Sequence, residues 1–201
     1  MKLFTTLILV GSLLLLPGVN SLQTGGAETS PTAPAVTSEV VDMAAIKSEL
    51  WRIDVSKAEE KIEHLKPGLT HEHVNTVARA FVAVTRDGII DPSTGISGTS
   101  VDIRLPIAIA YVESKFNQQA IGSSGEKSLM QVLPIRGRPI DRITSDRRYA
   151  IFWALTNCFV PGYNRAKEQG KSEREAIRRG LICYNGSASY ADKVLRVMDQ
   201  L

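Results

Sequence analysis

Residues 105–112 leave this chain few possible folds, because they are apolar on every side of a helix. A helix without a polar face has to be enclosed by other elements. Asp102 can cap the N-terminus, and Pro106 falls in the first turn, where backbone N–H groups have no partner within the helix. The sequence therefore predicts a buried helix inside a single core, with Glu113 near its C-terminal end.

The other apolar residues also recur at helical spacing. Residues 41–66 alternate apolar positions with charges until Pro67 and Gly68 end the pattern. Thr70 can cap the next helix, whose apolar stripe runs through residues 74–84. Further helices are predicted at residues 149–160, 164–169, 173–183 and 190–201. Because no segment shows strand-like alternation, we expect a mainly α fold.

The N-terminal part has the composition of an export signal. Lys2 precedes an apolar run over residues 3–16, and Pro17 and Gly18 end that run. This is the layout of a secretory signal peptide, and the run is shorter than the ~20 residues that span a bilayer. We therefore predict a signal peptide at 1–21, a flexible linker at 22–40, an extra N-terminal helix at 41–68 and one main domain at 69–201. The protein is then expected to be secreted across the inner membrane into the periplasm, with no permanent membrane span.

Charge and metal-ligand patterns exclude several kinds of site. The 24 basic and 21 acidic side chains give a net charge of +3, too small for a nucleic-acid-binding protein. His71 and His73 flank Glu72, but residues two apart do not share a helix face, so no metal site is expected. Cys158 and Cys183 either form a disulfide or serve as small buried hydrophobes.

Glu113 is the candidate catalytic residue. Cleavage of a glycosidic bond needs a carboxylic acid that stays neutral, and an apolar surrounding raises the pKa of a carboxyl. A glutamate between an apolar helix and a Gly- and Ser-rich loop meets this requirement. Glutamates at helix ends are also common and mostly inert, so the position alone does not separate a catalyst from a surface residue.

The residues that follow Glu113 make that distinction. The string from Glu113 through Ser114 to Asn117, then Ala120, Gly125, Leu129-Met130-Gln131 and Pro134, resembles the signature of the soluble lytic transglycosylases. A second motif of that family, Ala-Tyr-Asn, is matched here by Cys183-Tyr184-Asn185. The resemblance covers roughly residues 70–201. It implies one lysozyme-like helical domain, related to goose-type lysozymes, with the catalytic glutamate at a helix end.

The resemblance also implies a reaction and residue roles. Glu113 acts first as the acid and then as the base in cleavage of the β-1,4 bond between N-acetylmuramic acid and N-acetylglucosamine, which forms a 1,6-anhydro end. No metal or organic cofactor is required. Gln131 and Asn185 contact the glycan, Met130 lines the cleft, Ser114 holds the loop or bonds near the substrate, and Tyr184 points its hydroxyl toward Glu113.

Five positions depart from the family pattern. The family usually has proline at 118, serine at 122, alanine at 126, glycine at 128 and alanine at 183. This chain has, in that order, Gln118, Gly122, Glu126, Ser128 and Cys183. If residue 128 needs a positive φ, serine tolerates it poorly. Glu126 adds a charge at the rim of the cleft.

Two rival functions stay open. A hydrolytic muramidase on the same fold would use water in place of the sugar hydroxyl. A non-catalytic glycan-binding component of a cell-envelope assembly would keep the cleft without the reaction. The expected partner is the peptidoglycan glycan strand in either case. The linker and extra helix are compatible with docking to secretion, conjugation or phage machinery.

Overall fold

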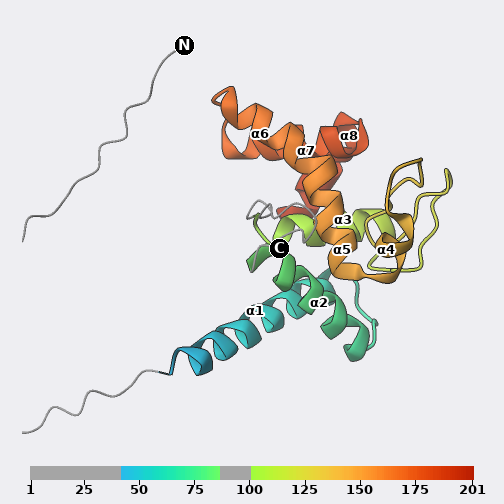
Figure 1. Cartoon of the computed structure of the whole chain (residues 1–201). Helices are drawn as coiled ribbons and strands as arrows, with labels where there is room; N and C mark the ends of the chain where they lie inside the picture. The colour runs from blue at the N-terminus through green and yellow to red at the C-terminus, as the bar shows by residue number, and fades with distance from the viewer. Residues whose placement is uncertain (1–41, 87–100) are drawn as a thin grey trace, which may run out of the picture. The chain divides into compact units, whose positions relative to one another are not determined.

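The computed structural model describes residues 42–86 and 101–201. The predicted signal peptide and linker lie outside these residues. Within them every regular element is a helix, and the only β-type pairings are isolated bridges in the loop around Lys127. Figure 1 shows the helices in chain order: α1 (Met43–Leu65), α2 (His71–Arg86), α3 (Arg104–Ser114), α4 (Ile140–Ser145), α5 (Arg147–Ala154), the π-helix η1 (Leu155–Phe159), α6 (Val160–Glu168), α7 (Glu173–Asn185) and α8 (Ala188–Met198).

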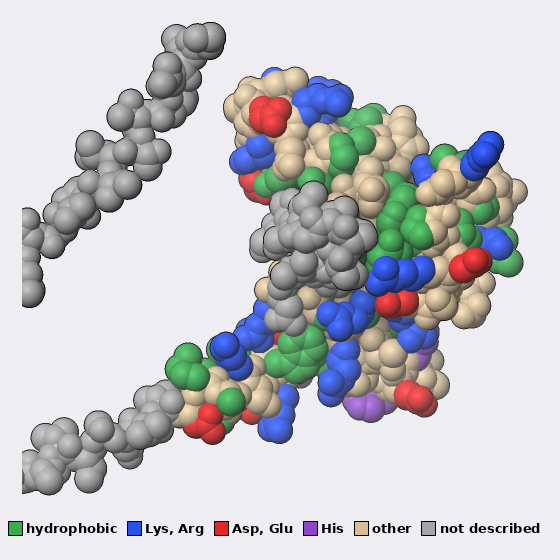
Figure 2. Space-filling view, in the orientation of Figure 1, with side chains coloured by type: hydrophobic (Ala, Val, Ile, Leu, Met, Phe, Trp, Pro, Cys, Tyr) green, Lys and Arg blue, Asp and Glu red, His purple; other side chains and the backbone are tan. Residues whose placement is uncertain are grey.

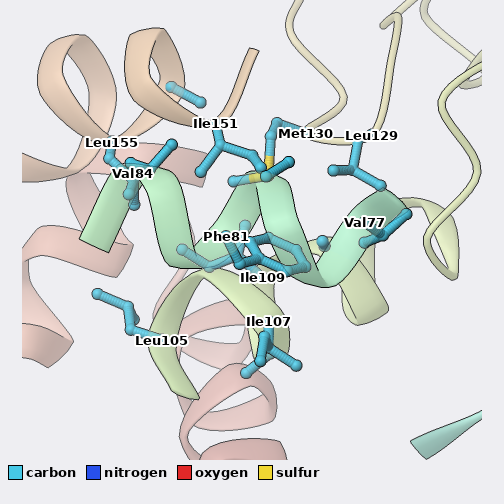
Figure 3. Packing of buried hydrophobic residues seen from close by; sticks show 14 of the residues in the cluster. Val77, Phe81, Val84, Leu105, Ile107, Ile109, Leu129, Met130, Ile151 and Leu155 are labelled. Atoms are coloured by element: carbon cyan, nitrogen blue, oxygen red, sulfur yellow. The ribbon is translucent and has the colours of Figure 1, made fainter. Parts of the chain in front are cut away.

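The core forms around α2 and α3. Leu105, Ile107 and Ile109 of α3 are buried, as are Val77 and Phe81 of α2. Figure 3 shows these side chains together with others from the loop after α3 and from the α5–η1 segment. Burying each such side chain stabilises the fold by about 1.5–3 kcal/mol. The predicted buried helix is confirmed, except that its last turn emerges from the core with Tyr111 and Val112 half-buried.

The C-terminal half of α1 belongs to the same core. Val55 and Ile62 are buried, and the Lys61 ammonium donates to the Leu201 backbone carbonyl at 2.8 Å. The helix ends where the sequence predicts, just before Pro67 and Gly68. Its N-terminal half carries exposed apolar side chains, with Met43 at 60% exposure. Figure 1 shows this half projecting from the other helices.

The later helices differ from prediction in two places. Residues 140–145 lie in the basic segment of residues 136–148, for which no helix is predicted, and they form the short helix α4. The predicted break after residue 160 is wrong, because η1 joins α5 directly to α6. Pro161 lies at the start of α6, and proline removes a helical N–H and clashes with the preceding turn. The wider π turn of η1 accommodates that mismatch without ending the helix.

The turn between α7 and α8 is short and well defined. Gly186 takes a left-handed backbone (φ +82°), and its N–H donates to the Ile182 carbonyl at 2.7 Å, which ends α7. Ser187 then caps α8 by accepting a hydrogen bond from the Tyr190 N–H. This turn fixes Tyr184 and Tyr190 relative to each other.

Within residues 42–86 and 101–201, none of the helices combines the length and the apolarity needed to cross a membrane.

Candidate active site

Glu113 lies in the last turn of α3. The next residues, Lys115 and Phe116, both have left-handed backbones (φ +52° and +66°), so the chain turns sharply after Ser114. Phe116 is fully buried and packs edge-on against Phe81, with ring centroids 6.5 Å apart. Packing of Phe116 in the core therefore holds the turn after α3, and this turn leaves Glu113 half-buried at the surface of the core.

The surroundings of Glu113 favour its neutral form. Burial is the largest influence and raises the pKa of the Glu113 carboxyl. The nearby Tyr190 hydroxyl and the Lys193 ammonium lower that pKa, while the negative charge of Glu126 raises it, and the net shift is upward. The neutral carboxyl is the form that can donate a proton.

The loop after α3 is held against Glu113 by polar side chains. The Ser114 hydroxyl lies 2.8 Å from the Leu129 carbonyl and 3.2 Å from the Ala110 carbonyl, so it links the end of α3 to the loop. The Gln131 amide donates to the carbonyls of Ala120 at 3.1 Å and Ser128 at 2.9 Å. Because these carbonyls are satisfied within the protein, the loop has one defined shape.

Two residues of this loop adopt unusual backbones. Ser128 has φ +74° and Gln131 has φ +45°. Ser128 is also buried, so the serine at the usual glycine position does sit in the left-handed region. Both strained residues flank Met130, whose buried side chain joins the core.

Tyr184 connects α7 to the same loop. Its hydroxyl donates to the Met130 carbonyl at 2.6 Å and not to Glu113, so the expected direction of this hydroxyl is corrected. The Met130 carbonyl is part of a buried turn and needs a donor, which Tyr184 supplies. The hydroxyl beside Glu113 belongs to Tyr190, and among the described residues this buried hydroxyl has no hydrogen-bond partner.

One cleft collects four of the predicted site residues: Met130, Gln131, Tyr184 and Asn185 line it together with Glu126, Arg138, Asn157, Cys158 and Cys183. Ser114 does not line it, because its hydroxyl faces backbone carbonyls. Glu113 does not itself line the cleft, but it lies near two residues that do: the charge of Glu126 raises the pKa of Glu113, and burial together with the charge of Glu113 raises the pKa of Tyr184. Sequence reasoning missed Glu126 and Tyr190 as site residues, although it singled out Glu126 as a departure and Tyr190 follows the second motif.

The side chain of Glu126 fills the space next to Gly122. A Cβ placed on Gly122 would collide with the Glu126 carboxylate and lie 2.7 Å from the Gln131 amide oxygen. The Glu126 carboxylate accepts from the Ser124 N–H at 3.0 Å, which keeps it in that space. The glutamate therefore occupies the volume that a serine side chain at position 122 would need.

The remaining candidates have structural roles or none. His73 lies with Nε2 2.9 Å from the Phe116 carbonyl, and the described residues contain no cluster of three possible metal ligands. Cys158 and Cys183 are free thiols in the structure. From the basic segment, Arg142 stacks on the Tyr149 ring at 3.7 Å and Arg138 lies over the Trp153 ring at 5.4 Å.

A family model described as the Transglycosylase SLT domain matches residues 96–158. The match contains Glu113, Ser114, Met130 and Gln131 and ends before Tyr184 and Asn185. Neither curated proteins nor solved structures yielded a match. The helical fold around a half-buried glutamate agrees with the family match, and the activity expected of such a domain is of the lytic transglycosylase type on peptidoglycan. Residues 96–158 are therefore similar to the SLT transglycosylase domain, which supports assignment to that family.

Proposed function

We propose that this protein is a lytic transglycosylase that cleaves the β-1,4 bond between N-acetylmuramic acid and N-acetylglucosamine and leaves a 1,6-anhydro end. The observation that carries the proposal is Glu113, a half-buried carboxyl with a raised pKa beside a cleft lined by polar groups. The family match supplies the substrate class.

In the first step Glu113 acts as the acid. Its proton moves to the glycosidic oxygen while the bond from C1 to that oxygen breaks, and the muramic acid ring acquires oxocarbenium character. The carboxyl then carries a negative charge close to the Tyr190 hydroxyl. That hydroxyl is free to donate to the new carboxylate, which would stabilise the charged form as it develops.

In the second step Glu113 acts as the base. The C6 hydroxyl of the same muramic acid attacks C1, and its proton returns to the Glu113 carboxylate as the C6–O–C1 bridge forms. No water molecule enters the product. The cycle leaves Glu113 protonated again, ready for the next bond.

The other residues hold the glycan or the site itself. Asn185 offers its amide group to sugar hydroxyl and acetamido groups, whereas Gln131 offers only its amide oxygen, because its nitrogen already donates to two loop carbonyls. Met130 contributes to the cleft wall. Ser114 and Tyr184 act as positioning residues, since both bond loop carbonyls on either side of Met130. This division rests on which hydrogen-bonding groups are already paired within the protein.

A hydrolytic muramidase is the second candidate, and Glu126 is the observation that favours it. Inverting glycosidases use a second carboxylate to activate water, at a separation of about 6.5–9.5 Å from the acid. Glu126 lines the cleft and is near enough to influence the charge of Glu113. It is anchored by the Ser124 N–H, however, and its position beside Gln131 is explained by packing against Gly122.

Mass spectrometry of peptidoglycan digested by the purified protein separates the two reactions. Anhydro ends without incorporation of ¹⁸O from labelled water support the transglycosylase. Reducing ends that carry ¹⁸O, lost in Glu126→Gln, would establish the hydrolase instead. Glu113→Gln is the control for both reactions, and full lysis by that variant would show a protein whose activity does not depend on Glu113.

We also propose that the chain is exported to the periplasm, where peptidoglycan is found. The apolar run at residues 3–16 supports this, and N-terminal sequencing of the protein recovered from the periplasm tests it: mature protein should begin close to residue 22. A role in opening the wall for secretion, conjugation or phage machinery is compatible with the exposed apolar face of α1.

A further inference from the structure

One wall of the cleft beside Glu113 offers hydrogen-bond acceptors and no side-chain donors. Glu126 and Gln131 both line the cleft, and both residues are half-buried, so a ligand can reach them. The side-chain nitrogen of Gln131 already donates to the Ala120 and Ser128 carbonyls, which leaves its oxygen for a ligand. The Glu126 carboxylate has no proton to donate. A ligand group on this wall therefore has to bring the donors.

The two acceptors lie close to one point. The Gln131 side-chain oxygen is 2.7 Å from the position that a Cβ on Gly122 would take, and one Glu126 carboxylate oxygen is closer still to that position. The Ser124 N–H donates to this carboxylate oxygen at 3.0 Å and holds it there. Because both acceptors approach the same point, a single ligand nitrogen with two or more N–H groups can bond to both.

Glu126 carries its charge without a counterion in the described residues. None of the ion pairs there includes Glu126. Arg138 lines the same cleft, but its guanidinium donates to the Leu133 carbonyl at 3.1 Å and lies over the Trp153 ring. The charge of Glu126 does reach the catalytic carboxyl, since it raises the pKa of Glu113. A group bound to Glu126 would therefore lie close to the bond that is cleaved.

This wall distinguishes among the groups that a glycan presents. A sugar hydroxyl brings one donor and no charge. The 2-acetamido group also brings one donor, but its carbonyl oxygen finds no donor on this wall. A free 2-amino group, when protonated, brings three donors and the positive charge that the Glu126 carboxylate needs as a partner. Of the three groups, the ammonium matches the wall best.

The charge of the whole molecule does not favour a cationic ligand. The chain has a net charge of +3, and Figure 2 shows Lys and Arg side chains spread over the face in view. General electrostatic attraction would therefore favour anions. A measured preference for an amine would report the local wall formed by Glu126 and Gln131.

We propose that Glu126 and Gln131 make the enzyme selective for glycan strands in which a sugar beside the cleaved bond has a free 2-amino group. The ammonium donates to the Glu126 carboxylate and to the Gln131 oxygen, and acetylation of the amine removes both the charge and two of the donors. The alanine that the family usually has at position 126 cannot supply this charge. The selectivity rests on the proposed function, because it decides which strands are held while Glu113 cleaves them.

Titration calorimetry tests the selectivity separately from catalysis. The full chain carrying Glu113→Gln, which prevents turnover, is titrated at mildly acidic pH with a glucosamine tetrasaccharide and with the same tetrasaccharide fully N-acetylated. We expect the amine form to bind about 10-fold more tightly, the size of one charge-assisted hydrogen bond. Adding Glu126→Gln keeps an acceptor for the Ser124 N–H and should reduce the preference to about 1–3-fold. Adding Glu126→Ala should reduce it as well.

Glu168→Gln is the matched control. Glu168 is an exposed acid at the end of α6 and does not line the cleft, so its loss should leave the preference intact. An equal loss of preference in Glu168→Gln and Glu126→Gln would show a general charge effect and overturn the proposal. So would equal binding of the two tetrasaccharides before Glu126 is changed, or an unchanged preference after Glu126→Gln.

An amine of the stem peptide is the other source of an ammonium group. A stem tripeptide with the free amine of its diamino acid, compared with the same peptide acetylated, tests that source. A preference for the free peptide amine that depends on Glu126, with no preference between the tetrasaccharides, would overturn the choice of the sugar amine. Absence of anhydro products from peptidoglycan, with an intact preference for the glucosamine tetrasaccharide, would refute only the proposed reaction.

Discussion

The rings of Tyr184 and Tyr190 stack in parallel, with centroids 6.1 Å apart and planes 1° from each other. Tyr184 lies in the last turn of α7 and Tyr190 in the first turn of α8, so the short turn at Gly186 brings the two rings together. The two hydroxyls nevertheless differ in their hydrogen bonding. One satisfies the Met130 carbonyl, and the other is buried beside Glu113 without a partner.

Removing the two hydroxyls should therefore separate stability from catalysis. Tyr184→Phe leaves the buried Met130 carbonyl without its donor, so the free energy of unfolding should fall by about 1–3 kcal/mol. Tyr190→Phe removes a buried hydroxyl that has no hydrogen-bond partner among the described residues, so its free energy of unfolding should stay the same or rise. Urea denaturation of both variants checks this order, and an equal loss in both would contradict it.

The two variants should show the reverse order in activity, so that Tyr190→Phe loses more of the catalytic rate than Tyr184→Phe. If the Tyr190 hydroxyl donates to the Glu113 carboxylate after the first proton transfer, its loss costs about 1.5–3 kcal/mol of transition-state stabilisation, or roughly 10- to 100-fold in rate. Release of anhydro-muropeptides under saturating peptidoglycan measures the effect. A Tyr190→Phe enzyme with wild-type turnover would show that this hydroxyl plays no part in the reaction.

The pH profile should respond to both neighbours of Glu113, in opposite directions. Glu113 must be protonated in the free enzyme, so kcat/KM falls as pH rises through its pKa. Glu126→Gln removes a like charge that raises this pKa, so the alkaline limb should move to lower pH. Tyr190→Phe removes a group that lowers the pKa, so the limb should move to higher pH. Shifts of the same sign in both variants would show that a different group controls the limb.

Glu113 should also reduce the stability of the fold at neutral pH. Because burial raises its folded-state pKa above the unfolded value, the stability that it contributes is present at low pH and is lost as pH rises through the folded pKa. Glu113→Gln is neutral at every pH and avoids this loss. The variant should therefore have the higher Tm at pH 7, and its advantage should disappear near pH 4. A constant difference across this range would mean that ionisation of Glu113 is not the cause.

The sequence was most informative about features that depend only on residues close together in the chain. The apolar stretch at residues 105–112 predicted the buried α3, and the positive φ considered for residue 128, where the family usually has glycine, is present at Ser128. Contacts between residues that lie far apart in the sequence were harder to predict. The bond from Tyr184 to Met130 joins residues 54 positions apart, and no spacing rule distinguishes it from a bond to Glu113. The space shared by Gly122 and Glu126 likewise depends on the fold of the loop.

Gly122 and Glu126 should behave as an energetically coupled pair. Gly122→Ser introduces a side chain into the space of the Glu126 carboxylate, and displacing that carboxylate breaks its bond to the Ser124 N–H. The single change should destabilise the fold by about 1 kcal/mol. Combined with Glu126→Ala, it should cost much less, giving a coupling energy of at least 0.5 kcal/mol. Additive effects in this double-mutant cycle would show that the two departures from the family pattern are independent.

Ser128 offers the most direct test of backbone strain in the site loop. A non-glycine residue with a left-handed backbone costs about 1–2 kcal/mol, and Ser128 has φ +74° with only a 3.4 Å contact from the Met130 N–H to its hydroxyl. Glycine relieves the strain but loses about 0.5–1 kcal/mol of backbone entropy on folding. Ser128→Gly should therefore raise the Tm by roughly 1–3 °C.

Ser128→Val is the matched opposite change. A β-branched side chain is a marked outlier at this φ, and position 128 is buried, so the larger side chain has no exit to solvent. We expect the Tm to follow the order glycine, serine, valine, from highest to lowest. Because the loop carries Met130 and Gln131, the glycine variant should also keep its lytic rate within a few-fold of wild type. A Tm lower in Ser128→Gly than in the wild type would show that the serine hydroxyl stabilises this turn by more than the strained backbone costs.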